Sequence, residues 1–198
     1  MEASSDIFPR FTELFRTTFG LDEAEYTRLL ACFHRRLLPK KAYYLTAGDV
    51  TRGKAYLNKG CTRTYVVEES GKEHVLFFSF EDWWVGDFQS YHTLQPGTQY
   101  VQALEDCELF WISRDDFTRL AAEIPKLQAW DQVKGRKSMF ATLNRLSEVK
   151  TMNAEERYLN LIEKHPAINQ RISLQDIAAF LDIEPQSLSR MRKRLSER

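Results

Sequence analysis

The spacing of apolar residues changes along the chain, and each spacing predicts a type of element. Over residues 8–19 and 22–38 apolar side chains recur every three or four positions, which predicts two amphipathic helices. From Tyr43 the period becomes two, and turn-forming residues recur between the apolar stretches. The predicted strands span 62–67, 75–80, 100–104 and 109–112. Many short strands separated by turns indicate a β-sandwich, a jelly roll or a barrel.

After the strands the spacing becomes helical again. It predicts a short helix over 115–123, a long one over about 126–149, and another that Asn153 can cap. The approximate heptad seam of the long helix consists of Leu127, Trp130, Val133, Phe140, Leu143 and Leu146. Gly135 interrupts this helix, and a glycine there costs about 0.5–1 kcal/mol relative to alanine, so it marks a bend or a close approach. The apolar side must be buried on the β-domain or on a second copy of the chain.

Residues 172–195 contain two short amphipathic helices separated by a break. Glu184 and Pro185 are expected to form the N-cap region and first turn of the second helix, because proline lacks only a donor that has no partner there. The apolar seam consists of Ile177, Ala178, Leu181, Ile183, Leu188, Met191 and Leu195. The opposite face carries Gln186, Ser189, Arg190 and Lys193. A bracing helix followed by a polar, basic helix is the helix-turn-helix arrangement; the alternative is a terminal hairpin with a solvated charged face.

The polar face of the second helix suits the hydrogen-bonding groups of DNA. Gln186 can pair with adenine, Arg190 with guanine, and Lys193 with guanine or phosphate. Ser187 and Ser189 are expected to contact phosphates or nothing. The expected DNA-binding residues are Gln186, Ser187, Ser189, Arg190, Lys193 and Arg194. Because groove-binding helices usually act in pairs on two half-sites, we expect the long helix to pack against a second copy.

Composition limits these interpretations. The 198-residue chain has a net charge of zero, so any affinity for DNA must come from a local basic patch. That patch contains Arg190, Arg192, Lys193, Arg194 and Arg198. No apolar run approaches the roughly 20 residues of a membrane span, and the polar N-terminus does not resemble a signal peptide. The three cysteines are widely spaced, which is typical of reduced thiols in a cytoplasmic protein rather than of a disulfide framework, zinc site or iron–sulfur cluster.

The order of elements resembles the Crp/Fnr family of bacterial transcription regulators, over nearly the whole chain. The resemblance is sharpest at 56–60 (Tyr-Leu-Asn-Lys-Gly), 71–80 (Gly-Lys-Glu-His-Val-Leu-Phe-Phe-Ser-Phe) and 156–161 (Glu-Arg-Tyr-Leu-Asn-Leu). Residues 82–87 and 185–195 resemble the branch found in the Bacteroidetes group. The resemblance implies an α+β protein that binds DNA sequence-specifically. Its expected parts are N-terminal helices with a jelly-roll, cyclic-nucleotide-binding-like sensor domain (1–124), a connecting and dimerisation helix (125–150), and an all-α helix-turn-helix domain (151–198).

The cyclic AMP site of that family is degenerate here. Members that bind cyclic AMP hold its ribose with a Gly-Glu pair and its phosphate with an arginine ten residues further on. The corresponding residues are Gly86-Asp87 and Gly97, and no lysine or arginine lies between Asp87 and Asp106. A charge-assisted contact is worth about 1.5–3 kcal/mol, so we expect no useful affinity for cyclic AMP and a less anionic effector, or none. The degenerate pocket is expected at Gly86, Asp87, Phe88, Thr98, Gln99 and Thr142.

Aromatic residues are unusually frequent near this pocket. They are Phe77, Phe78, Phe80, Trp83, Trp84, Phe88 and Tyr91. We expect most of them to fill the core of the β-domain, and an apolar effector site is the alternative.

The resemblance also implies differences in the C-terminal domain. Asp182 replaces the glycine common in the turn, and aspartate tolerates the left-handed conformation less well than glycine but acceptably. The sequence ends at Arg198, so the usual C-terminal wing is expected to be missing. The expected switch is a rotation about 151–153 that places two recognition helices one DNA turn, about 34 Å, apart.

Other function classes fit less well. A cupin-type metal enzyme or a haem sensor needs convergent ligands, whereas His34, His74, His92, His165 and Cys61 are scattered. A cyclic-nucleotide- or small-molecule-binding signalling module that acts on protein partners would expose apolar anchors instead of a polar stripe. We expect no catalytic residues, metal or cofactor. The expected partners are double-stranded DNA, a second copy, a small-molecule effector and RNA polymerase, with no membrane contact.

Overall fold

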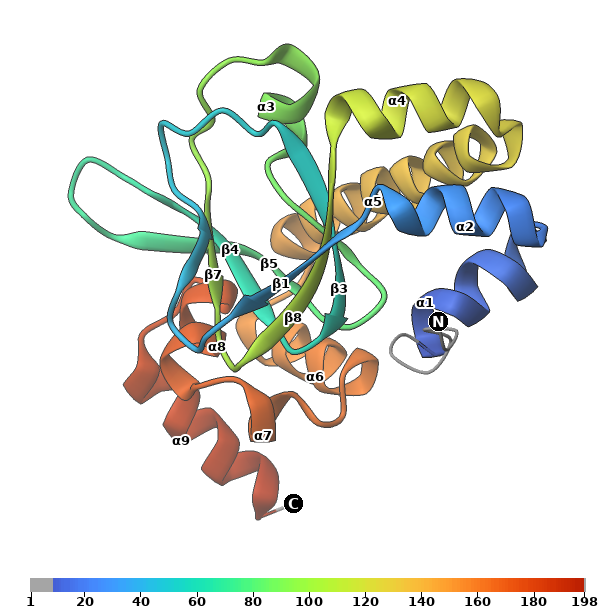
Figure 1. Ribbon diagram of the computed structural model, residues 1–198. Helices are drawn as coiled ribbons and strands as arrows, with labels where there is room; N and C mark the ends of the chain where they lie inside the picture. The colour runs from blue at the N-terminus through green and yellow to red at the C-terminus, as the bar shows by residue number, and fades with distance from the viewer. Residues whose placement is uncertain (1–8, 198) are drawn as a thin grey trace.

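The computed structural model describes residues 9–197, and over this range eight strands form a sandwich flanked by helices (Figure 1). The strands are β1 (His34–Leu38), β2 (Tyr43–Leu45), β3 (Gly53–Lys59), β4 (Thr62–Val67), β5 (Glu73–Ser79), β6 (Trp84–Val85), β7 (Tyr100–Ala103) and β8 (Cys107–Ser113). They pair antiparallel in two sheets, in the orders β1-β8-β3-β6 and β2-β7-β4-β5. The expected mixed fold with a β-sandwich domain is confirmed.

The helices lie before and after the sandwich, apart from one that lies between two strands. They are α1 (Pro9–Thr12), the π-helical segment η1 (Glu13–Thr18), α2 (Glu23–Ala31), α3 (Phe88–Thr93), α4 (Arg114–Glu123), α5 (Pro125–Thr151), α6 (Ala154–Lys164), α7 (Ile168–Arg171), α8 (Leu174–Leu181) and α9 (Pro185–Ser196). Phe8, which the first predicted helix included, lies outside the described residues. Over residues 9–197 the structure contains no helix with the length and apolar character that a membrane crossing requires.

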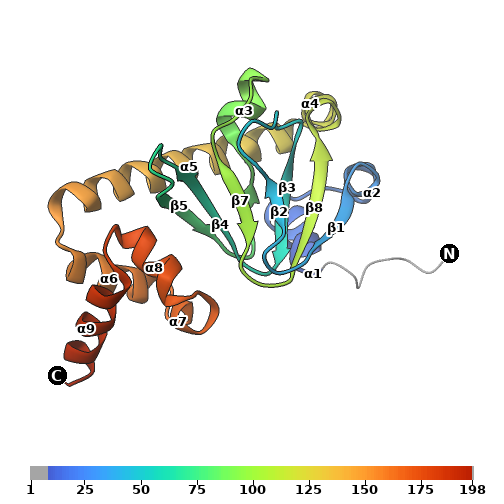
Figure 2. The same ribbon diagram turned by 90° about the vertical axis from the view of Figure 1, so that its left-hand side faces the viewer.

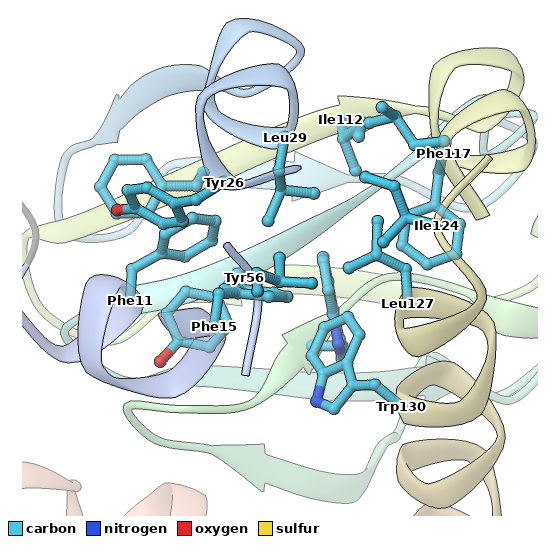
Figure 3. Close-up of a cluster of buried hydrophobic side chains, with 14 residues drawn as sticks. Phe11, Phe15, Tyr26, Leu29, Tyr56, Ile112, Phe117, Ile124, Leu127 and Trp130 are labelled. Atoms are coloured by element: carbon cyan, nitrogen blue, oxygen red, sulfur yellow. The ribbon is translucent and has the colours of Figure 1, made fainter. Parts of the chain in front are cut away.

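The central strands β3 and β8 bury side chains on both faces. Leu57 and Leu109 lie between the sheets, whereas Tyr56 and Phe110 face the helices. On that second face, an aromatic cluster joins the N-terminal helices, α4 and the start of α5 to the sheet (Figure 3). Trp130 of α5 is buried in it. The first turns of α5 are therefore anchored to the sandwich.

One sequence prediction was wrong: the helix expected over 22–38 ends at Ala31. Its start matches the prediction, because Asp22 forms a capping box with Glu25. Residues His34–Leu38 instead form strand β1, which pairs with β8 from His34↔Trp111 to Leu38↔Cys107. Most side chains of β1 are exposed, so the strand has no alternating apolar pattern. Its conformation depends on the backbone hydrogen bonds to β8, which lies far away in the sequence.

Helix α5 carries the chain from the sandwich to the C-terminal helices (Figure 2). It passes through Gly135 without a break, and nothing lies within 4 Å of a Cβ placed on that glycine. Met152 then adopts an extended conformation, and Asn153 and Glu156 form a capping box that starts α6. Helices α6–α9 share a core that also contacts the sandwich through Cys61.

Candidate nucleic-acid interface and interdomain cavity

Helices α8 and α9 form the predicted helix-turn-helix. Ser173 caps α8 by accepting a hydrogen bond from the backbone N–H of Asp176 (3.1 Å). Asp182 ends α8 in the left-handed conformation, with φ of 53°. Glu184 is extended at the N-cap of α9, and Pro185 occupies its first turn. The start of α9 at Glu184 and Pro185 therefore matches the prediction from the sequence.

The inner face of α9 is held by an apolar core. Leu188 is completely buried and Met191 is 6% exposed. They pack in one cluster with Ile177, Ala178 and Leu181 of α8. Because α8 holds α9 along this seam, the outer face of α9 has a fixed orientation.

The outer face of α9 is accessible. Five of the six predicted DNA-binding residues are exposed, and Ser187 is half-buried: the exposed ones are Gln186, Ser189, Arg190, Lys193 and Arg194. The Ser187 hydroxyl accepts a hydrogen bond from Arg190 Nη2 (3.1 Å), and Arg194 Nη2 pairs with Glu155 of α6 (3.2 Å). Both views of the ribbon place α9 on the outer side of the C-terminal domain, away from the sandwich (Figures 1 and 2).

The C-terminal domain docks on the sandwich through α7 and α8. Arg63 of β4 binds both Asp176 of α8 (2.9 Å) and Glu73 of β5 (2.6 Å). Arg171 of α7 pairs with Glu81 (2.8 Å), and the pairing contributes to the raised pKa of its guanidinium. The contacts from Arg63 to Asp176 and from Arg171 to Glu81 join residues 113 and 90 positions apart, and the sequence pattern did not predict them.

A cavity of about 540 Å³ lies among the sandwich, α5, α6 and α8. Its lining includes four of the predicted effector residues: Gly86, Phe88, Gln99 and Thr142. The other two lie elsewhere. Asp87 is buried and caps α3 by accepting a hydrogen bond from the backbone N–H of Ser90 (3.0 Å). A Cβ on Gly97 would collide with this carboxylate, and Thr98 is exposed.

The aromatic residues near the cavity do not mostly fill the core, so that expectation was wrong. Trp84 and Tyr91 are buried. The others are half-buried or exposed: Phe77, Phe78, Phe80, Trp83 and Phe88. All five line the cavity. Phe78 and Phe80 also pack against the core of the C-terminal helices, and the Phe78 ring centroid lies 5.1 Å from that of Phe180.

The cavity contains cations that the sequence analysis did not anticipate. Arg145 of α5 and Arg157 and Lys164 of α6 line it, together with His165. Burial, followed by the charge of Arg157, lowers the pKa of the Arg145 guanidinium. Burial also lowers the pKa of His165. These side chains lie outside the segment from Asp87 to Asp106 and come from elements that only the fold brings together.

Both arginines bind the C-terminal end of α8. Arg145 Nη2 donates to the carbonyl oxygen of Phe180, and its guanidinium lies 3.9 Å from the centroid of the Phe180 ring. Arg157 Nη2 donates to the carbonyl oxygen of Leu181 (2.9 Å). A helix C-terminus carries partial negative charge, so cations stabilise it. Within residues 9–197, no group of three or more His, Cys, Asp or Glu side chains is arranged to hold a metal ion.

Comparison with known proteins adds independent findings. A family profile for the cyclic nucleotide-binding domain matches residues 35–123. The Anaerobic regulatory protein of Pasteurella multocida is 26% identical over 197 residues, which cover 90% of this chain and 69% of that protein. Regulatory protein HlyX of Actinobacillus pleuropneumoniae is 24% identical over 187 residues, covering 87% of this chain and 76% of that protein.

A solved structure shares the fold. The c-di-GMP responsive global regulator CLP of Xanthomonas campestris matches with a TM-score of 0.73 at 19% identity. The match covers 89% of this chain and 92% of the other. The shared architecture thus includes both the sandwich and the C-terminal helices.

Proposed function

We propose that this chain is a transcription regulator of the Crp/Fnr type and that it binds double-stranded DNA sequence-specifically with the outer face of α9. The observation that carries the proposal is the exposed stripe of amide, hydroxyl and cationic side chains on a helix whose inner face is locked to α8. A helix of this kind can enter the major groove and keep a defined register.

The six predicted DNA-binding side chains have separate proposed roles. Arg190 bonds to guanine in two places, and Gln186 bonds to adenine in the same way. Lys193 contacts guanine or a phosphate, while Ser187, Ser189 and Arg194 contact phosphates. Because Arg194 already pairs with Glu155, its phosphate contact requires that surface ion pair to open. The Ser187–Arg190 hydrogen bond favours a defined direction of the guanidinium.

We propose that the protein acts as a homodimer joined along α5. The second half of this helix leaves apolar side chains exposed: Val133 (37%), Met139 (52%), Phe140 (55%), Leu143 (52%), Leu146 (57%) and Val149 (48%). Contiguous exposed apolar surface of this kind marks an interaction site. The open space at Gly135 leaves room for close approach of the partner helix. Two α9 helices in such a dimer would contact two half-sites.

The proposed division of the chain is a sensor domain (1–124), a dimerisation helix (125–150) and a DNA-binding domain (151–198). The two-residue break at Met152 and Asn153 supports a rotation of the DNA-binding domain there. We propose an effector other than cyclic AMP, since no lysine or arginine lies on the segment from Asp87 to Asp106. We also propose that the protein is cytoplasmic, has RNA polymerase as a partner and has no catalytic role. The resemblance to the Bacteroidetes branch likewise stays a proposal.

The test is a DNA-binding measurement on the full chain. Fragments selected from random DNA are titrated with Arg190→Ala and with the control Arg52→Ala, which removes an exposed arginine on the sandwich. Loss of a bidentate contact to guanine costs about 1–3 kcal/mol, so we expect Arg190→Ala to weaken specific binding roughly tenfold or more. Arg52→Ala should bind as the wild type does. Sequence-specific binding that survives Arg190→Ala unchanged would show that α9 is not the recognition helix.

A further inference from the structure

We infer that the interdomain cavity binds an amphipathic organic anion, an aromatic carboxylate or sulfonate, with its charged group at Arg145 and Arg157 and its ring among the aromatic side chains of the sandwich. This inference rests on the proposed function, because it names the chemical class of effector that the sensor domain would take. It differs from the expectation of a less anionic ligand that the segment from Asp87 to Asp106 suggested.

The charged end of the site is defined by two arginines with unused donors. Arg145 Nη1 and Arg157 Nε are buried and have no hydrogen-bond partner. The nearby carboxylate of Glu148 accepts hydrogen bonds from Lys164 (2.6 Å) and Asn160 (2.8 Å). Buried donors without partners cost free energy, and an anion that accepts from both would remove that cost.

The side of the site that the sandwich forms is aromatic. Phe77, Phe78, Phe80, Trp83 and Phe88 line it from the sandwich side. The segment from Asp87 to Asp106, where cyclic AMP binders carry their phosphate-binding arginine, has no lysine or arginine here. Arginines and aromatic rings therefore line the same site, and a ligand that combines an anionic group with an aromatic ring matches both. The volume of about 540 Å³ is adequate for a small aromatic acid.

The charged end is connected to the DNA-binding domain. The same two guanidinium groups donate hydrogen bonds to the carbonyl oxygens of Phe180 and Leu181, at the end of α8. Phe180 also lines the cavity. A ligand anion would share both arginines with the helix that braces α9. Occupancy of the cavity would thereby change how firmly the DNA-binding domain is held.

The experiment uses two fluorescent probes that differ by one charge. Anilinonaphthalene sulfonate has an aromatic system and a sulfonate, and phenylnaphthylamine has the same rings without the anion. Both are titrated into the full-length wild type, Arg145→Gln and Arg136→Gln. Arg136 is an exposed arginine on the same helix that does not line the cavity, which makes it a matched control.

We expect the sulfonate to bind the wild type at one site per chain. Arg145→Gln should weaken binding of the sulfonate tenfold or more, because a charge-assisted hydrogen bond to a buried anion contributes more than a factor of ten to the affinity. The affinity for phenylnaphthylamine should stay within about twofold of the wild-type value. Arg136→Gln should change neither. Equal weakening of both probes in Arg145→Gln, or of neither, would overturn the inference.

A second variant covers the case in which Arg145→Gln fails to fold, judged by its thermal melt. Ala141→Trp adds an indole to the cavity wall and keeps both arginines, so it should abolish binding of both probes. Retention of either probe by this variant would place the binding site elsewhere and refute the inference. Arg190→Ala should bind both probes as the wild type does. A failure of the DNA-binding proposal is thus separable from a failure of the cavity proposal.

Discussion

Replacing Leu188 with alanine tests whether the orientation of α9 depends on the seam with α8. Leu188 has no exposed surface and lies on the inner face of α9, opposite the proposed DNA-binding side chains. Truncation of leucine to alanine removes about three carbons, each worth about 0.8 kcal/mol when buried. With the cavity that remains, the loss should be about 2–5 kcal/mol.

That loss is large compared with the stability of the domain that bears it. Native proteins have about 0.05–0.15 kcal/mol of stability per residue, so a domain the size of 151–198 has only about 2–7 kcal/mol in all. Leu188→Ala should therefore unfold a substantial fraction of the C-terminal helices and leave the sandwich intact. DNA affinity should fall even though the variant keeps every side chain proposed to contact a base.

The assay combines calorimetric melting with DNA titration. Leu159→Ala is the control, since Leu159 lies in the same domain, undergoes the same chemical change and is 45% exposed. We expect a lower melting temperature for the C-terminal transition and weaker DNA binding in Leu188→Ala only. A wild-type melting profile and wild-type affinity in Leu188→Ala would refute the claim that this seam holds the recognition helix. Equal effects of the two substitutions would refute it as well.

Two further outcomes are expected. Leu143→Glu places a charge in the exposed apolar stripe of α5, so light scattering should report a monomer where the wild type is a dimer. The surface substitution Lys150→Glu should leave the mass unchanged. A dimeric Leu143→Glu variant would show that the interface lies away from this stripe. Calorimetry of the wild type with cyclic AMP should show no binding at micromolar concentrations, since the segment between Asp87 and Asp106 supplies no lysine or arginine for the phosphate. Micromolar affinity would contradict that reasoning.

Short-range chemistry determined several elements directly from the sequence. The capping box of Asn153 and Glu156 starts α6, and Pro185 starts α9. The apolar spacing around Leu188 distinguishes the inner face of α9 from the outer one. Each of these signals acts within about two turns of one helix, so no tertiary contact is needed to interpret it. The helix-turn-helix and its exposed face were therefore predictable.

Only the tertiary structure decided the rest. Strand β1 has mostly exposed side chains and owes its conformation to pairing with β8. The docking of α8 depends on Arg63 and Asp176, which are 113 positions apart. Likewise, the cavity obtains its cations from Arg145 and Arg157, on two successive helices, and its rings from the sandwich. Hydrogen bonds and ion pairs of this kind need the fold to bring their partners together, and no local periodicity records them.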